Sequence, residues 1–239
     1  MKFCLNRQTP YSVISGLLLL LTVWGCGSST TKTESNSVSN SDTTSSAGIK
    51  AGIPSKKGVI LFYGNSLTAG YGVEPAQAFP ALIGQKIDSA GLKYSVVNAG
   101  LSGETTAGGK SRISWVMRQP VAVFVLELGG NDGLRGLPLA DTRKNLQAII
   151  DTVRQKSPQA TIVLAGMQIP PNIGTSYTRE FRGLFKELAE KNKLILIPFL
   201  LEGVGGIAKL NQPDGIHPTP AGHKIVANTV WTILRPVLK

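Results

Sequence analysis

Cysteine and histidine are scarce in this chain of 239 residues, which has two of each. No cysteine follows Cys26, so the rest of the chain can form neither an internal disulfide bond nor a thiolate zinc site. The two histidines, His217 and His223, do not suffice for zinc either, and we expect neither a metal nor a cofactor. A general base that titrates near neutral pH must be one of these histidines, unless a perturbed carboxylate or lysine serves instead.

Acidic residues are also few, and aromatic residues make up only 6% of the chain. Lysine and arginine number 25 against 14 acidic residues; removing residues 1–25 deletes Lys2 and Arg7 and leaves 23 against 14, a formal charge of +9. The basic residues are scattered, without interleaved aromatic residues or a nucleic-acid binding motif. We therefore expect a preference for anionic surfaces, no nucleic-acid partner and no obligate protein partner.

The N-terminal segment is typical of an exported protein. Two basic residues precede a short apolar run at 13–24, which ends at Gly25 and Cys26. The run is too short and too interrupted by glycine to span a bilayer, so we interpret 1–25 as a signal peptide. A cysteine after a small residue resembles the bacterial lipoprotein processing box, in which that cysteine is lipidated, although Trp24 stands where a small residue is usual.

Three segments follow from this interpretation: a lipoprotein signal peptide (1–25), a flexible Ser/Thr-rich tether (26–56) and one folded domain (57–239). Lipidation of Cys26 would anchor the protein to a membrane of the bacterial cell envelope, facing the periplasm or the cell surface. The alternative is plain secretion, with Cys26 as an incidental thiol.

Short apolar runs alternate with helical patterns along the domain. This alternation predicts an α/β fold, a three-layer α/β/α sandwich around a five-stranded, mainly parallel sheet. We expect strands, each buried on both faces, at 58–63, 94–98, 121–126, 161–165 and 194–198, and helices at 76–90, 138–156, 177–193 and 220–238. For the connection at about 100–120 the pattern gives no clear element.

Candidate catalytic residues follow the strands, at the sheet edge where ligands bind in such folds. Ser66 follows the first strand, Gly103 the second and Asn131 the third, while Asp214 and His217 precede the last helix. A serine, a histidine and a carboxylate are the set required for acyl transfer.

His217 is a better base than His223, because a carboxylate lies three positions before it and prolines at 213 and 218 keep the segment non-helical. Alone, this pair would fit an Asx turn equally well, and a serine after a strand usually caps a helix.

Four ordered blocks resemble those of the GDSL, or SGNH, hydrolase superfamily, over essentially 57–239. They are Gly-Asn-Ser-Leu at 64–67, Asn-Ala-Gly-Leu-Ser-Gly at 98–103, Gly-Gly-Asn-Asp at 129–132 and Asp-Gly-Ile-His at 214–217. The sequence around these blocks is similar to that of bacterial arylesterases and multifunctional thioesterase/lysophospholipases, one branch of the superfamily. The resemblance implies a flavodoxin-like SGNH fold.

The resemblance also implies roles. Ser66 would be the nucleophile, His217 the base and Asp214 the residue that orients it. The oxyanion would be bound by the backbone N–H groups of Ser66 and Gly103 and by the side-chain amide of Asn131. A side chain at 103 would obstruct the approach of the backbone to substrate.

One position departs from the family, which usually has aspartate before the serine where this chain has Asn65. Because that aspartate is not the acid of the triad, we expect activity to survive. The segment also lacks the second glycine of a G-x-S-x-G elbow, which argues against the lipase-type α/β-hydrolase fold. We interpret Glu104, Glu127 and Asp132 as structural or solvated residues, not catalytic ones.

The loop at 167–174, stiffened by two prolines, is expected to reach the same edge. Leu134, Ile169 and Ile173 are our candidates for the wall of an acyl-binding site, with anchoring of the loop into the core as the alternative.

These observations predict a serine esterase that hydrolyses short- to medium-chain acyl esters, thioesters or lysophospholipids through an acyl-enzyme. Two alternatives remain open. One is a carbohydrate acetylesterase of the same superfamily, which the scarcity of aromatic residues around the motifs disfavours. The other is an inactive lipid-binding lipoprotein, suggested by Asn65 and opposed by the intact triad.

Overall fold

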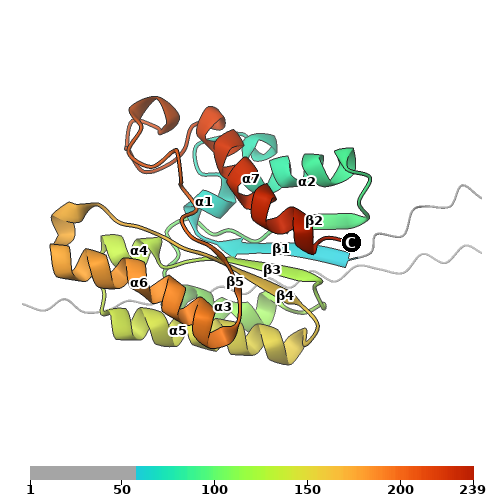
Figure 1. Cartoon of the computed structure of the whole chain (residues 1–239), viewed down its shortest axis with the longest axis horizontal. Coiled ribbons are helices and arrows are strands. Elements are labelled where there is room, and N and C mark those ends of the chain that lie inside the picture. Colours follow the sequence, from blue (N-terminus) through green and yellow to red (C-terminus); the bar gives the residue numbers. More distant parts are fainter. Residues whose placement is uncertain (1–57) are drawn as a thin grey trace, which may run out of the picture. The chain divides into compact units, whose positions relative to one another are not determined.

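The computed structural model describes residues 58–239 (Figure 1). The predicted signal peptide, Cys26 and the predicted tether lie outside the described residues. Across residues 58–239, no helix combines the length and the apolar character that crossing a membrane requires.

A single parallel sheet of five strands forms the centre of the domain, in the order β2-β1-β3-β4-β5. This is the strand order of flavodoxin-like folds, and it confirms the predicted class. Every strand ends at the same edge, so the loops that follow the strands gather there. The strands are β1 (Gly58–Gly64), β2 (Tyr94–Asn98), β3 (Val123–Glu127), β4 (Thr161–Ala165) and β5 (Ile195–Ile197).

Helices cover both faces of this sheet. In Figure 1, α2 (Phe79–Ser89) and α7 (Pro220–Leu234) lie on one face, while α3 (Thr106–Val116), α5 (Leu139–Lys156) and α6 (Thr175–Asn192) lie on the other. The predicted three-layer sandwich is confirmed. Two short helices follow strands at the functional edge, α1 (Ser66–Ala69) after β1 and α4 (Gly130–Leu134) after β3. Short 3-10 turns occur at Pro75–Gln77, Pro171–Ile173, Ala208–Leu210 and Arg235–Val237.

The prediction that all strands are buried on both faces is wrong for the two edge strands. β5 pairs with β4 alone and is only partly buried at Ile195 and Leu196, and the departure is larger in β2. This strand pairs with β1 alone, so it lies at the edge of the sheet, and Val97 and Asn98 are exposed at its carboxyl end. The core strands β1 and β3 are buried as expected, because each has a neighbour on both sides and helices on both faces.

Helix boundaries also differ from the sequence pattern. The connection at 100–120 contains α3, whose Gly108 and Gly109 lower its helical propensity and hide it from a pattern-based reading. At the C-terminus, α7 ends at Leu234, since Pro236 cannot continue the helix and the chain tightens into a 3-10 turn.

Candidate active site

Ser66 begins helix α1, directly after the central strand β1. The N-cap of this helix is Asn65, whose Oδ1 accepts a hydrogen bond of 2.9 Å from the backbone N–H of Leu67. Ser66 is therefore the first helical residue and not the cap. Its backbone N–H points from a helix N-terminus, where partial positive charge gathers.

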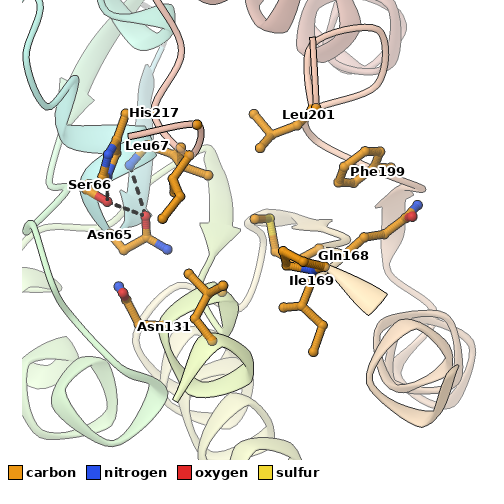
Figure 2. Close-up of a pocket in the computed structure, with 17 residues that line it drawn as sticks. Asn65, Ser66, Leu67, Asn131, Gln168, Ile169, Phe199, Leu201 and His217 are labelled. Atoms are coloured by element: carbon orange, nitrogen blue, oxygen red, sulfur yellow. Dashed lines mark hydrogen bonds between the residues drawn. The ribbon is translucent and has the colours of Figure 1, made fainter. Parts of the chain in front are cut away.

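The segment before α7 brings Asp214 and His217 to Ser66. The Ser66 hydroxyl donates to Nε2 of His217 at 2.9 Å, and Nδ1 of His217 donates to Oδ2 of Asp214 at 2.6 Å (Figure 2 shows the first of these bonds). The other oxygen of Asp214 accepts from the backbone N–H groups of Ile216 (2.8 Å) and His217 (3.0 Å). The Asx turn and the Asp–His pair are thus both present, and the turn sets the direction of the carboxylate.

The hydrogen bonds around Asp214 stabilise its charge. The hydrogen bond from the backbone N–H of His217 has the largest effect and lowers the pKa of Asp214. Desolvation raises this pKa, but the bonds from the His217 imidazole and the Ile216 N–H lower it further, and the net result is a pKa of about 2. The carboxylate is therefore ionised throughout the neutral range.

Gln212 fixes this loop in place. Its backbone N–H donates to the carbonyl of His217 at 2.7 Å, and its side-chain amide donates to the carbonyls of Tyr71 and Pro218. The ring of Tyr71 lies 4.7 Å from that of His217, centroid to centroid. The imidazole is consequently confined both by its hydrogen bonds and by an aromatic neighbour.

The second histidine has a different environment. His223 lies in the first turn of α7, only 1% exposed, and its Nδ1 accepts from the backbone N–H of Phe79 at 3.3 Å. Burial, with a smaller contribution from His217, lowers its pKa to about 4. It is a neutral core residue, not a base facing the pocket.

The candidate oxyanion donors come from the segments that follow three strands: Ser66 after β1, Gly103 after β2 and Asn131 after β3. Asn131, in α4, borders the pocket together with Ser66, and one hydrogen of its amide is donated to the carbonyl of Glu104 at 3.0 Å, which leaves the second hydrogen available. Gly103 precedes Glu104 but does not border the pocket itself. Its φ of +79° is a conformation that favours glycine, whereas no protein atom lies near the place of a Cβ. Backbone conformation is thus the structural reason for glycine there.

A cavity of about 450 Å³ opens beside Ser66 and His217, with Asn131 on its border (Figure 2). Its wall is mainly apolar. Two of the three predicted wall residues, Leu134 and Ile169, belong to it, together with Leu67, Met167, Pro170, Phe199, Leu201 and Ile216.

Residues 62–225, about two thirds of the chain, match the sequence profile described as the GDSL-like lipase/acylhydrolase family. The chain belongs to this family. As a GDSL, or SGNH, hydrolase it is a serine esterase that acts on small acyl substrates, as the sequence predicts.

Relatives of this GDSL hydrolase include proteins named as an esterase and as a thioesterase/lysophospholipase. Esterase TesA of Pseudomonas aeruginosa is 39% identical over 75% of this chain and 89% of its own length. Thioesterase 1/protease 1/lysophospholipase L1 of Escherichia coli strain K12 is 36% identical over 75% of this chain and 84% of its own. A crystal structure of TesA superposes with a TM-score of 0.72 and 39% identity, covering 75% of this chain and 99% of the other.

The structure corrects one wall residue of this GDSL hydrolase. Ile173 lies outside the cavity lining, because the 3-10 turn at Pro171–Ile173 directs it toward the core, where it is partly buried. The alternative reading, anchoring of the loop, is the correct one for this residue.

Sequence reasoning missed the wall that follows β5. Phe199 and Leu201 border the cavity from this segment, and the available signal was their position directly after the carboxyl end of a strand.

Two of the three acidic residues set aside as non-catalytic have structural partners away from Ser66. Asp132 accepts from the backbone N–H and the hydroxyl of Thr106, which ties α4 to α3. Glu104 forms a salt bridge with Arg112. Both are buried and neither borders the cavity.

Proposed function

We propose that this GDSL hydrolase cleaves acyl esters with Ser66 as nucleophile, His217 as general base and then acid, and Asp214 as the group that holds the imidazole. The observation that carries the proposal is the pair of hydrogen bonds, 2.9 Å from Ser66 to His217 and 2.6 Å from His217 to Asp214. Because Nδ1 donates to the carboxylate, Nε2 is left free to take the hydroxyl proton.

Attack by Ser66 forms an ester bond to the acyl carbon while its proton moves to His217, and His217 returns the proton to the leaving alcohol. A water molecule then attacks the acyl-enzyme and gives a proton to His217. The bond between the acyl carbon and Ser66 Oγ breaks, His217 returns the proton to that oxygen, and the acid is released. We assign the negative oxygen formed in each step to the backbone N–H of Ser66 and the amide of Asn131, which both border the cavity, and to the backbone N–H of Gly103, which the sequence resemblance alone supports.

The acyl chain occupies the cavity. Its volume of about 450 Å³ is in the lower half of the range usual for small-molecule sites, and its lining is apolar, which suits one alkyl chain of short to medium length. A sugar acetate is a poorer fit, because Phe199 is the only phenylalanine, tyrosine or tryptophan among the described residues that line the cavity. Rates on aryl esters of increasing chain length, compared with acetylated xylan, test this choice.

Replacement of the nucleophile tests the proposal. Ser66→Ala in the full chain should lower kcat by about a million-fold, the size seen when a triad nucleophile is removed, with an unchanged melting temperature. A serine-directed phosphonate should label Ser66 in the wild type and nothing in the variant. Ser111→Ala, a change at an exposed serine of α3, is the matched control and should keep full activity. Labelling of another serine, or activity above a few per cent in Ser66→Ala, would refute the assignment.

We also propose, from the sequence alone, that Cys26 is lipidated and holds the enzyme at the cell envelope. Two or more acyl chains suffice for stable anchoring, whereas one binds only marginally. Incorporation of a labelled fatty acid, absent in Cys26→Ser, tests this; an unlabelled and fully soluble wild type would indicate secretion.

A further inference from the structure

Glu127 places a buried carboxylate directly behind the nucleophile. It is the last residue of β3, pairs with Gly64 in the sheet and is 0% exposed. A side chain at Gly64 would come within 2.5 Å of Glu127 Oε2, so only glycine allows the carboxylate to lie this close to the turn that carries Ser66.

Three donors from that turn satisfy the carboxylate. Oε1 accepts from the side-chain amide of Asn65 at 2.7 Å, while Oε2 accepts from the Asn65 backbone N–H at 3.1 Å and from the Thr68 hydroxyl at 2.8 Å. Both donor residues are buried and uncharged. The hydrogen-bond partners of Glu127 in the nucleophile turn, Asn65 and Thr68, are therefore both neutral.

These bonds leave the Asn65 amide with one orientation. Its nitrogen faces Glu127. Its oxygen accepts from the Leu67 N–H and lies 3.4 Å from the Ser66 hydroxyl, and Figure 2 marks both of these contacts with dashed lines. If the amide were flipped, an oxygen would face the carboxylate and an N–H group would face the Leu67 N–H. Both contacts would be unfavourable, so Glu127 determines which Asn65 atom faces Ser66.

We propose that Asn65 and Glu127 are positioning residues for Ser66, and that their pairing requires a carboxylate at one position and an amide at the other. The inference rests on the proposed role of Ser66. It assigns a function to Asn65, the one residue of the nucleophile block that departs from the family pattern.

Complementarity, not residue identity, is what the pairing demands. With Asn65→Asp, two carboxylate oxygens would lie about 2.7 Å apart in a buried site and would have to share a proton. With Glu127→Gln, two amides would meet, and at least one buried donor would lose its acceptor. In the double variant, the introduced glutamine amide can donate to the introduced aspartate, which can still accept from Leu67 N–H. The hydrogen bonds between the two side chains and to the turn are then restored, and the negative charge lies at position 65 instead of position 127.

Burial already raises the pKa of Glu127 to about 7, against the opposing effect of its hydrogen bonds to Thr68 and Asn65. No charged side chain contributes to this shift. Asn65 and Ser66 lie between Glu127 and His217 in the chain of hydrogen bonds. The titration of a shared proton in Asn65→Asp would therefore report on the pair itself.

Steady-state kinetics on an aryl ester from pH 5 to 10 test the inference with Asn65→Asp, Glu127→Gln and the double variant. We expect kcat of Asn65→Asp to be near that of the wild type at pH 6 and to fall about tenfold or more above pH 8. Glu127→Gln should lose about tenfold or more at every pH, with little change in KM. The double variant should recover to within about threefold of the wild type and lose the alkaline decline.

Asn192→Asp is the matched control, the same change in a buried amide network at the end of α6. It should lower the melting temperature without altering the shape of the pH profile. If Glu127→Gln does not fold, the rate at which a phosphonate labels Ser66 in Asn65→Asp at pH 6 and pH 9 carries the test. A double variant no better than the weaker single variant, or a profile of Asn65→Asp parallel to the wild type, would overturn the inference. Failure to label Ser66 in the wild type would instead refute the proposed function.

Discussion

Asp214→Asn isolates what the carboxylate contributes beyond occupying space. An asparagine here has one oxygen for two tasks: accepting from the backbone N–H groups of Ile216 and His217, and facing Nδ1 of His217. Keeping the two backbone bonds turns the NH₂ group toward Nδ1. The imidazole must then carry its proton on Nε2, where it cannot accept the proton of Ser66.

The opposite orientation of the asparagine amide is less favourable. Its oxygen would face Nδ1, but its NH₂ group would oppose two backbone donors that now lie 2.8 and 3.0 Å from the carboxylate. The first orientation is therefore favoured, and most molecules hold the wrong tautomer. We expect kcat to fall by about 10⁴, the cost known for a triad with the wrong tautomer, while KM changes little because Asp214 does not border the cavity.

The assay is hydrolysis of an aryl ester at pH 7.5, with the rate of phosphonate labelling as a second readout. Asp151→Asn, an exposed change on α5 where the side chain accepts one bond from Gln147, controls for loss of a surface charge. A loss below about tenfold in Asp214→Asn would refute the argument from the tautomer. A large rise in KM with unchanged kcat would show that Asp214 acts on substrate binding instead.

Two further predictions concern other parts of the site. Asn131→Ala should lower kcat by about 10²–10³ with a small change in KM, because the amide acts on charge that develops in the transition state; an effect confined to KM would contradict that role. His223→Gln should keep most activity and change how stability depends on pH. Burial lowers the pKa of His223 from 6.5 to about 4. As the pH falls, this imidazole is therefore protonated in the unfolded chain before it is protonated in the folded protein. The contribution of His223 to stability is present above pH 6.5 and is lost as the pH falls toward 4. Glu127, with its raised pKa, has the opposite slope between pH 4.5 and 7, so the measurement is the difference in melting temperature between wild type and variant across pH 4–7.5. A constant difference would show that His223 does not titrate as described.

The sequence predicts the fold well where periodicity is strong. The strand at 161–165 agrees with β4, and the helix predicted at 138–156 differs from α5 by one residue, because apolar runs and amphipathic spacing are local signals. The exposure of β2 depends on its place at the edge of the sheet, which is a matter of strand order and leaves no mark in the five residues of the strand.

The candidate site divides in the same way. Ser66, Asp214 and His217 stand out because their neighbours form motifs and because only two histidines exist. The cavity wall has no such signal: Ile169 lines it and Ile173, four residues later, does not, since a 3-10 turn between them changes the direction of the chain. Phe199 and Leu201 reach it only because β5 pairs with β4.

Asn65 shows why a motif alone misjudges a substitution. Read along the chain, the usual aspartate has been lost, which is what suggested an inactive protein. The register of β1 against β3 places Glu127 opposite Gly64, 62 positions from Asn65 in the sequence, so a carboxylate still lies behind Ser66. The amide supplies the donor that this carboxylate requires, and two buried acids need not share one proton. The substitution therefore leaves one buried acid behind Ser66 instead of two, and its effect on the enzyme is expected in the pH dependence of turnover and not in the loss of turnover.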